Sequence, residues 1–131
     1  MFATVFVLLF VAHMVADYAV QTDHQATHKA DRTAEGWRAN LTHAATHVIA
    51  CALALVAGAA LLDGVHLPVA RAVAAVAWVG VSHGFIDRRW PIARWMDNTG
   101  SADFRTRGGA QHVDQTAHLL CLAVAALIVA A

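Results

Sequence analysis

Histidine and aspartate recur at the spacing of one helical turn inside segments that are otherwise apolar. The chain has nine histidines, while only 14% of its 131 residues are charged. Ionisable side chains inside long apolar segments are costly, and they commonly mark functional sites. A spacing of i, i+4 places both members of a pair on one face of a helix. Four such pairs occur: His13 and Asp17, His43 and His47, His83 and Asp87, and Asp114 and His118.

These eight side chains have the chemistry of metal ligands. Imidazole and carboxylate groups suit zinc, iron and manganese. Five histidines and three aspartates exceed the needs of a single ion. We therefore expect one or two divalent ions, with zinc as the first choice and iron or manganese as alternatives, and with Asp17 or Asp87 as a bridge. The alternative is that the eight groups only hydrogen-bond one another between helices.

Four apolar segments must position the pairs. They cover about residues 2–20, 41–62, 67–87 and 113–131. Each is close to the ~20 residues that a helix needs to cross a bilayer core of ~30 Å, and none alternates with period two. We therefore predict an all-α membrane protein with a single transmembrane domain, 1–131, whose four helices form an up-down-up-down bundle. The longer loops would be about 21–40 and 88–112.

Two other interpretations of the apolar segments are weaker. The first segment could be a signal peptide, but no Lys or Arg precedes it, and His13 and Asp17 lie in or beside its apolar run. The chain could also form a soluble four-helix bundle. The helices of such a bundle need polar outer faces, and the second to fourth segments have almost none.

The basic residues set the expected orientation. Eight of the nine Lys and Arg residues fall in the two longer loops, and only Arg71 lies elsewhere. The positive-inside rule then places both loops in the cytoplasm and both termini outside. All four pairs would meet in the cytoplasmic half, in two layers one helical turn apart. The deeper layer is His13, His47, His83 and His118, and the shallower layer is Asp17, His43, Asp87 and Asp114.

The pairs also indicate an internal repeat. Val11-Ala12-His13 with Asp17 matches Val81-Ser82-His83 with Asp87, and the pair His43 and His47 matches the pair Asp114 and His118. The bundle would then be built from two parallel helical-hairpin repeats, related by a pseudo-two-fold axis along the membrane normal. Such an axis brings both halves of the site together at the centre of the bundle.

Further polar residues surround the expected mouth of the site. Arg88 and Arg89 directly follow Asp87 and could clamp a phosphate, or they could simply contact lipid headgroups. For His24 and His28 we favour a solvated helix end. The other residues that we expect beside the ligands or the substrate are Gln21, Asp23, Lys29 and Gln115.

Several of these residues together resemble a known family. The run Asp17-x-x-x-Gln21-Thr22-Asp23, followed by Lys29, is the most specific part. With His13, His43, His83, Asp87, Asp114-Gln115 and His118, it resembles the small bacterial integral-membrane proteins of domain-of-unknown-function family 3307 (DUF3307). The resemblance covers nearly the whole chain and implies a multi-pass protein of the bacterial inner membrane, but it names no activity. The pattern has a looser similarity to LexA-regulated inner-membrane proteins described as metal-dependent hydrolases.

Four functions compete for this pattern. The first is a metal-dependent hydrolase that acts on a phosphoester or lipid at the cytoplasmic face, with Asp17, Asp87 or Asp114 as the general base. The second is non-catalytic binding or transport of a divalent metal, although a conduit needs polar groups across the full span. The third is a haem-binding electron carrier, which the interleaved aspartates disfavour. The fourth is a structural or partner-binding protein whose polar cluster only fixes helix packing.

Composition limits the partners. Nine acidic and nine basic side chains cancel, which argues against a nucleic-acid binder. Two cysteines are too few for a disulfide scaffold. Membrane lipid is the expected partner of a chain that is 59% hydrophobic, and the alanine-rich helices could also pack against a second copy in a homo-oligomer.

Overall fold

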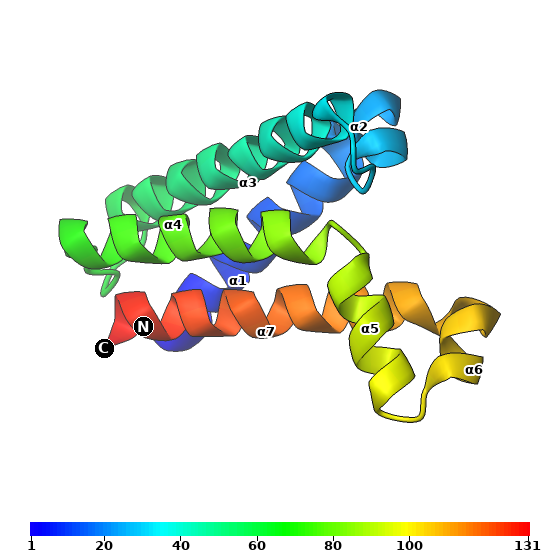
Figure 1. Ribbon diagram of the computed structural model, residues 1–131. Coiled ribbons are helices and arrows are strands. Elements are labelled where there is room, and N and C mark those ends of the chain that lie inside the picture. The colour runs from blue at the N-terminus through cyan, green and yellow to red at the C-terminus, as the bar shows by residue number, and fades with distance from the viewer.

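The computed structural model describes residues 1–131, and the chain is helical with no strands. Four long helical segments form one bundle (Figure 1). Because four of the helices are long and apolar enough to cross a membrane, the predicted fold class is confirmed. The four segments are α1 (Phe2–Met14) with its π-helical continuation η1 (Val15–Val20), α3 (Ala34–Leu61), α4 (Val69–Ile86) and α7 (Ala110–Ala130).

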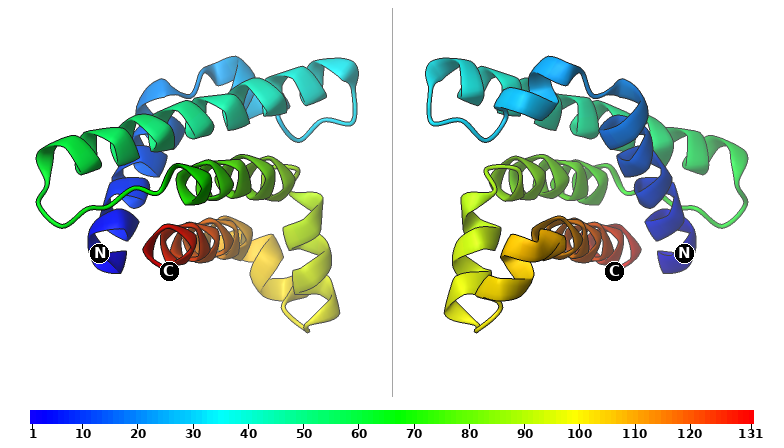
Figure 2. Two further views of the ribbon diagram at one scale, coloured as in Figure 1. Left: turned by 90° about the vertical axis from the view of Figure 1, so that its left-hand side faces the viewer. Right: turned by 90° about the vertical axis from the view of Figure 1, so that its right-hand side faces the viewer.

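The long helices alternate in direction around the bundle. α1 packs on α3 and α7, and α4 packs on the same two helices, so the four form a closed ring. Both termini and the α3–α4 turn lie at one end, whereas α2 (Asp23–His28), α5 (Trp90–Asn98) and α6 (Ala102–Phe104) lie at the other (Figures 1 and 2). This is the predicted up-down-up-down order. The equivalence of the two hairpins as repeats stays a prediction.

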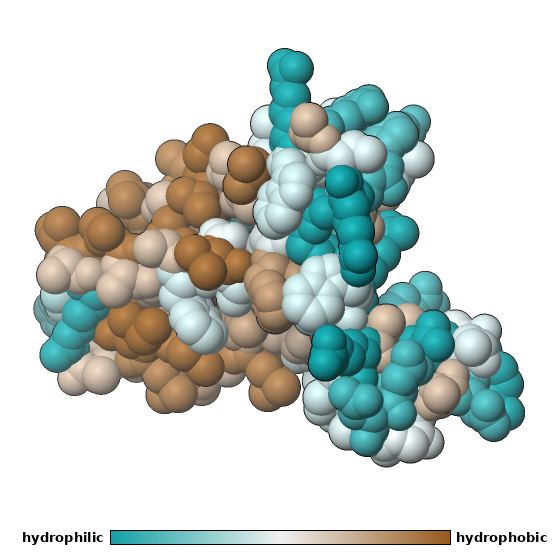
Figure 3. All heavy atoms as spheres, viewed as in Figure 1, coloured by the Kyte–Doolittle hydropathy of each residue, from teal (hydrophilic) through white to brown (hydrophobic).

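The outer surface divides into an apolar part and a polar end. Apolar side chains such as Leu53, Val69 and Leu120 are exposed on the outward faces of the long helices, where lipid would contact them. Polar side chains gather at the end of the bundle that carries α2, α5 and α6, which we call the polar end (Figure 3). This division is typical of a bundle whose long helices cross a membrane and whose polar end lies in water.

The half of the bundle near the termini has a closely packed apolar core. Small side chains let the helices approach one another, and a Cβ at Gly80 in α4 would come within 2.6 Å of Val48 in α3. The core consists of Val5, Leu9, Ala12, Cys51, Leu55, Ala75, Val79, Leu122, Ala125, Ala126 and Val129. No histidine or charged side chain belongs to this core, which therefore separates the polar end from the opposite end of the bundle.

Two helices extend further into the polar end than the sequence indicated. α3 begins at Ala34 rather than near residue 41, because the Thr33 hydroxyl accepts a hydrogen bond from the Gly36 backbone N–H at 3.0 Å and caps the helix. α7 begins at Ala110 rather than near residue 113. Hydropathy marks only the membrane-crossing part of a helix, so it misses a polar extension.

Both longer loops contain short helices, whereas the sequence indicated only a solvated helix end at His24 and His28 and no helix within residues 88–112. Thr22 and Gln25 form a capping box that starts α2. α5 begins at Trp90, has Pro91 in its first turn, and lies across the ends of α4 and α7 (Figure 1). These short helices surround the place where the histidine and aspartate pairs meet.

Candidate metal centre

All four pairs lie where the long helices reach the polar end, and they meet inside the bundle. Asp17 lies in η1, whose π-helical turn is wider than an α-helical turn and redirects the side chains that follow. His13, His43 and His47 are fully buried, and Asp17 is 8% exposed. Polar groups buried this deeply require partners.

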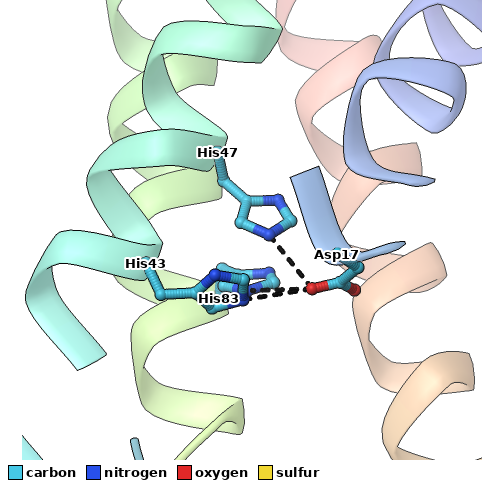
Figure 4. Close-up of side chains that lie close together, drawn as sticks. All are labelled: Asp17, His43, His47 and His83. Atoms are coloured by element: carbon cyan, nitrogen blue, oxygen red, sulfur yellow. Dashed lines mark hydrogen bonds and ion pairs between the residues drawn. The ribbon is translucent and has the colours of Figure 1, made fainter. Parts of the chain in front are cut away.

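Asp17 is the centre of the first group. Its Oδ1 lies 3.1 Å from Nε2 of His43, 3.2 Å from Nε2 of His47 and 3.9 Å from Nε2 of His83 (Figure 4). These residues come from η1, α3 and α4. The ligand atoms of a tetrahedral zinc ion, bonded at about 2.0–2.1 Å, lie roughly 3.3 Å apart. The first group therefore has the dimensions of a metal site.

Asp87 is the centre of the second group, which shares His83 with the first. Its Oδ2 lies 3.0 Å from Nε2 of His83, and its Oδ1 lies 3.9 Å from Nε2 of His118. Asp87 directly follows the last residue of α4, outside the apolar span. Burial alone raises the pKa of its carboxyl group, but the neighbouring His83 and Lys29 hold that pKa below its ordinary value. Lys29 and His83 therefore stabilise the negative charge of Asp87.

His13 joins the two groups from α1. Its Nε2 lies 3.2 Å from Oδ2 of Asp17, the carboxylate oxygen that the first group does not use. Its ring centroid lies 5.0 Å from that of His47, 5.5 Å from that of His83 and 5.3 Å from that of His118. The four histidines that we expected in the deeper layer therefore lie together. The two oxygens of Asp17 face different histidines, which is the arrangement of a bridging carboxylate.

Asp114 lies on the outer side of His118. Its Oδ2 is 3.3 Å from Nδ1 of His118, and its backbone oxygen is 3.0 Å from the same nitrogen. A proton on Nδ1 can donate to either oxygen, which leaves Nε2 with its lone pair turned toward the cluster. Carboxylate partners orient metal-binding histidines in this way. The structure thus gives Asp114 the position of an orienting group for His118.

Lys29 enters the cluster from the segment after α2, where the sequence placed it only at the mouth. Its Nζ lies 3.0 Å from Oδ2 of Asp87 and 3.2 Å from Nε2 of His43, and the residue is 9% exposed. The same nitrogen of His43 lies 3.1 Å from Oδ1 of Asp17, so it either accepts from the ammonium group or donates to Asp17, depending on which ring nitrogen carries the proton. Lys29 thus ties His43 to Asp87 from the outer side of the cluster.

Several buried polar atoms of the cluster make no hydrogen bond of ordinary geometry and meet other members of the cluster only as ion pairs. They are Nε2 of His13, Nε2 of His83, Nε2 of His118 and Oδ2 of Asp87. Nε2 of His83 and Nζ of Lys29 each lie 3.0 Å from Oδ2 of Asp87, and Nε2 of His13 lies 3.2 Å from Oδ2 of Asp17. A bound cation would be held by these same atoms.

The two neighbouring arginines have different positions. Arg88 is buried, donates to the backbone oxygens of Lys29 at 2.8 Å and Asp31 at 2.6 Å, and lies 4.3 Å over the ring of Trp37. Arg88 therefore holds the segment that carries Lys29 and does not face the solvent-accessible mouth. Arg89 is exposed at the mouth, where its Nη2 donates to the backbone oxygen of Ala26 at 3.2 Å.

The remaining predicted residues surround the cluster or lie away from it. Gln21 donates from Nε2 to the backbone oxygen of Asp17 at 2.8 Å and so supports η1. Gln115 is half-buried on α7 beside Asp114. Asp23 is exposed in the first turn of α2 and contacts none of the cluster residues in an ion pair or hydrogen bond. Gln21 and Asp23 therefore support the local backbone at the polar end, and neither side chain supplies a ligand.

A separate, exposed group lies on the outside of the polar end. The ligand atoms of His24, His28 and Glu35 lie within 4.8 Å of one another. His28 Nδ1 is also 2.9 Å from Oδ2 of Asp31. The sequence predicts a solvated helix end at these histidines, and it gives no signal at Glu35 because no periodic pattern links α2 to the start of α3. The group is exposed to solvent and must be controlled for in any metal analysis.

The fold and the cluster define a class: a four-helix membrane-type bundle with a buried histidine–aspartate centre at its polar end. The chain belongs to the DUF3307 family, whose model, described as "Protein of unknown function (DUF3307)", matches residues 5–131. No curated protein and no solved structure matches the chain. The expected family membership is thus confirmed, and the looser similarity to LexA-regulated hydrolases stays an expectation.

Proposed function

We propose that the buried cluster binds one or two divalent metal ions, with zinc as the first choice, and that the centre hydrolyses a phosphoester at the cytoplasmic face. The observation that carries metal binding is the convergence of buried ligand atoms in two groups that share His83, with the atoms of each group within 4.8 Å of one another. Asp17 and Asp87 carry two negative charges against the single positive charge of Lys29. The cluster therefore has one negative charge in excess, which favours a cation.

The chain's own residues divide the work between holding the metal and handling the substrate. A bound divalent ion lowers the pKa of a water ligand and polarises a phosphoryl oxygen. His13, His43, His47, His83 and His118 offer nitrogens, and Asp17 and Asp87 offer oxygens. Asp87 and Asp114 both reach a cavity that opens to solvent, whereas Asp17 does not. Asp114 is therefore the carboxylate best placed to accept a proton from water there.

The other functions fit these contacts less well. Metal transport needs polar groups along the whole path, and the apolar core blocks the half near the termini. A haem needs a slot between its axial histidines, yet the ring centroids of His47 and His83 are 3.5 Å apart. A purely structural cluster would keep the same internal ion pairs without metal, and metal analysis distinguishes it from a metal centre.

We place the polar end in the cytoplasm of a bacterium, with both termini outside. The support is the gathering of Lys and Arg in the two longer connections, which both lie at the polar end. Reporter fusions at the C-terminus and within α5 test this orientation. Cytoplasmic signals from the C-terminal fusion would contradict it.

Elemental analysis of the purified protein tests metal binding. The starting protein should carry H24A/H28A, because these changes remove the exposed group and leave the cluster unchanged. In this background we expect one or two equivalents of zinc after loading. H83Q should reduce the content most, since His83 belongs to both groups. Metal content that is at background before and after loading, or that is unchanged in H83Q, would contradict the proposal.

Hydrolysis is tested with the loaded protein and a panel of soluble and lipid phosphoesters. D114N is the informative variant, because Asp114 contacts His118 from outside the cluster. We expect D114N to retain most of the metal and to lose most of the turnover. Full turnover in D114N would remove Asp114 from the reaction, and no turnover by the loaded parent protein would remove the hydrolase function while leaving the metal centre.

A further inference from the structure

A cavity of about 510 Å³ opens beside the cluster at the polar end. Its volume falls within the roughly 300–1,000 Å³ of small-molecule sites. Two carboxylates of the candidate centre, Asp87 and Asp114, lie on its inner side. The remaining lining residues are Lys29, Arg89, Ile92, Ala93, Arg105, Ala110 and Gln111. A ligand in this cavity would therefore contact the centre directly.

Three cationic side chains line this cavity. Lys29 lies at its inner side against Asp87, at 3.0 Å. Arg105 donates from Nε to Oδ1 of Asp97 at 2.8 Å, which fixes its guanidinium and leaves the terminal amino groups free. Arg89 uses one terminal nitrogen for the backbone oxygen of Ala26. Both arginines thus keep donors for a ligand while being held in place.

The backbone at Arg89 is held in an unusual conformation. Its φ is 60°, and it is the only residue other than glycine with a positive φ. The Trp90 N–H donates to the backbone oxygen of Arg88 at 2.6 Å, which closes a γ-turn around Arg89. Such strain persists only where the surrounding structure enforces it, and it clusters at functional sites. Here the turn joins α4 to α5 and places Arg89 at the cavity, two residues after Asp87.

Arg105 lines the same cavity because the backbone is kinked a few residues after it. Gly108 has a φ of 94°, which kinks the helical path inside η2 (Arg105–Gly109), just before α7 begins. A Cβ at Gly109 would overlap the ring of Phe104, so glycine lets this segment fold back on itself. This connection places Arg105 on the lining of the same cavity as Arg89 and Ala110.

We propose that this cavity, which we call the arginine cavity, binds the phosphate group of the substrate through Arg89 and Arg105. Guanidinium groups recognise phosphate through paired hydrogen bonds, and two of them match several oxygens at once. The apolar wall of Ile92, Ala93 and Ala110 can hold the organic part of a phosphoester. This inference rests on the proposed function for its chemistry, but the anion site itself does not require turnover.

The first test is binding of inorganic phosphate to the zinc-loaded protein, measured by calorimetry. R89A and R105A should each weaken phosphate binding at least tenfold. R94A is the matched control, because Arg94 is exposed on α5, loses the same charge and does not line the cavity. Equal binding by the parent protein and both cavity variants, or an equal loss in R94A, would overturn the assignment.

The second test separates a lipid phosphate from a soluble one. Vesicles with phosphatidic acid and a water-soluble phosphomonoester are compared as competitors of inorganic phosphate. Competition by vesicles alone identifies a lipid headgroup, and competition by the soluble compound identifies a soluble ligand; either result requires sensitivity to R105A. Competition that is insensitive to R105A would overturn the proposal.

Metal content distinguishes failure of this inference from failure of the proposed function. R89A and R105A should keep the zinc content of the parent, since neither residue contacts the cluster. Full zinc content without phosphate binding would overturn the arginine cavity and leave the metal centre. Phosphate binding that depends on both arginines in a protein without bound zinc would support the anion site and contradict the metal centre.

Discussion

Metal binding should stabilise the bundle, because the ligands come from four different helical segments. A ligand that binds only the folded protein stabilises it by about 2.7 kcal/mol at a free concentration 100 times its Kd. About 1 kcal/mol shifts the midpoint by roughly 4 °C for a chain of this size, so zinc should raise the Tm by about 10 °C. The assay is thermal unfolding in detergent at fixed protein concentration, with zinc or with a chelator, in the H24A/H28A background.

H83Q is the decisive variant in this assay. Gln is close to His in size and keeps a polar atom, but it removes the nitrogen that lies 3.0 Å from Asp87 and 3.9 Å from Asp17. We expect the zinc-dependent shift to fall to about 2 °C or less, as fewer ligands lower the occupancy at the same zinc concentration. The control is R94A in the same H24A/H28A background, which keeps His83 and changes an exposed position, and it should retain the full shift.

Two outcomes would refute the reasoning. If zinc shifts the Tm of H83Q as much as that of its background, the metal does not bind at the shared histidine. If zinc changes the Tm of neither protein although elemental analysis finds bound metal, the metal is not held by ligands from separate helices. Since both proteins are compared at their own unfolding midpoint, a general loss of stability in H83Q does not obscure the result.

Three further perturbations follow from the cluster and its surroundings. R88A should lower the free energy of unfolding by about 3 kcal/mol in chemical unfolding, because it removes two charged hydrogen bonds to the backbone of Lys29 and Asp31. R88K should recover only part of this loss. A loss below ~1 kcal/mol in R88A would show that Arg88 does not hold the Lys29 segment. R89G should be more stable than R89A by about 1 kcal/mol in the same assay, because glycine adopts a positive φ freely; equal stability would contradict the strained turn. K29M should raise the zinc affinity about tenfold or more in chelator competition, because it removes a positive charge beside Asp87. A lower zinc affinity in K29M would contradict this reasoning and show that the ammonium group stabilises the metal-bound site.

The convergence of the histidine–aspartate pairs could be predicted from the sequence. The i, i+4 spacing shows which side chains share a helix face, and the limits of each apolar segment show near which end they lie. An up-down-up-down bundle brings the C-terminal ends of its first and third helices to the N-terminal ends of the second and fourth. His13 and His83 lie in the last turns of α1 and α4, and His47 and His118 lie in the first third of the apolar segments 41–62 and 113–131, so their convergence required only the right direction of each helix. The four rings do lie together.

Helix periodicity could not predict the positions of the polar side chains around the cluster. Lys29 and Arg105 lie in connecting segments, where no periodicity fixes the direction of a side chain. The inward position of Lys29 depends on Arg88, which holds the backbone oxygen of Lys29 from the end of α4. The orienting position of Asp114 depends on which nitrogen of His118 faces it, and spacing alone leaves that open.

X-ray absorption spectroscopy of the zinc-loaded H24A/H28A protein tests the central claim most directly. The cluster predicts a first shell of nitrogen and oxygen at about 2.0–2.1 Å with the multiple-scattering pattern of several imidazoles, reduced in H83Q. Sulfur at about 2.3 Å, from Cys51 or Cys121, would contradict the assigned ligands. A shell without imidazole would contradict the metal centre itself.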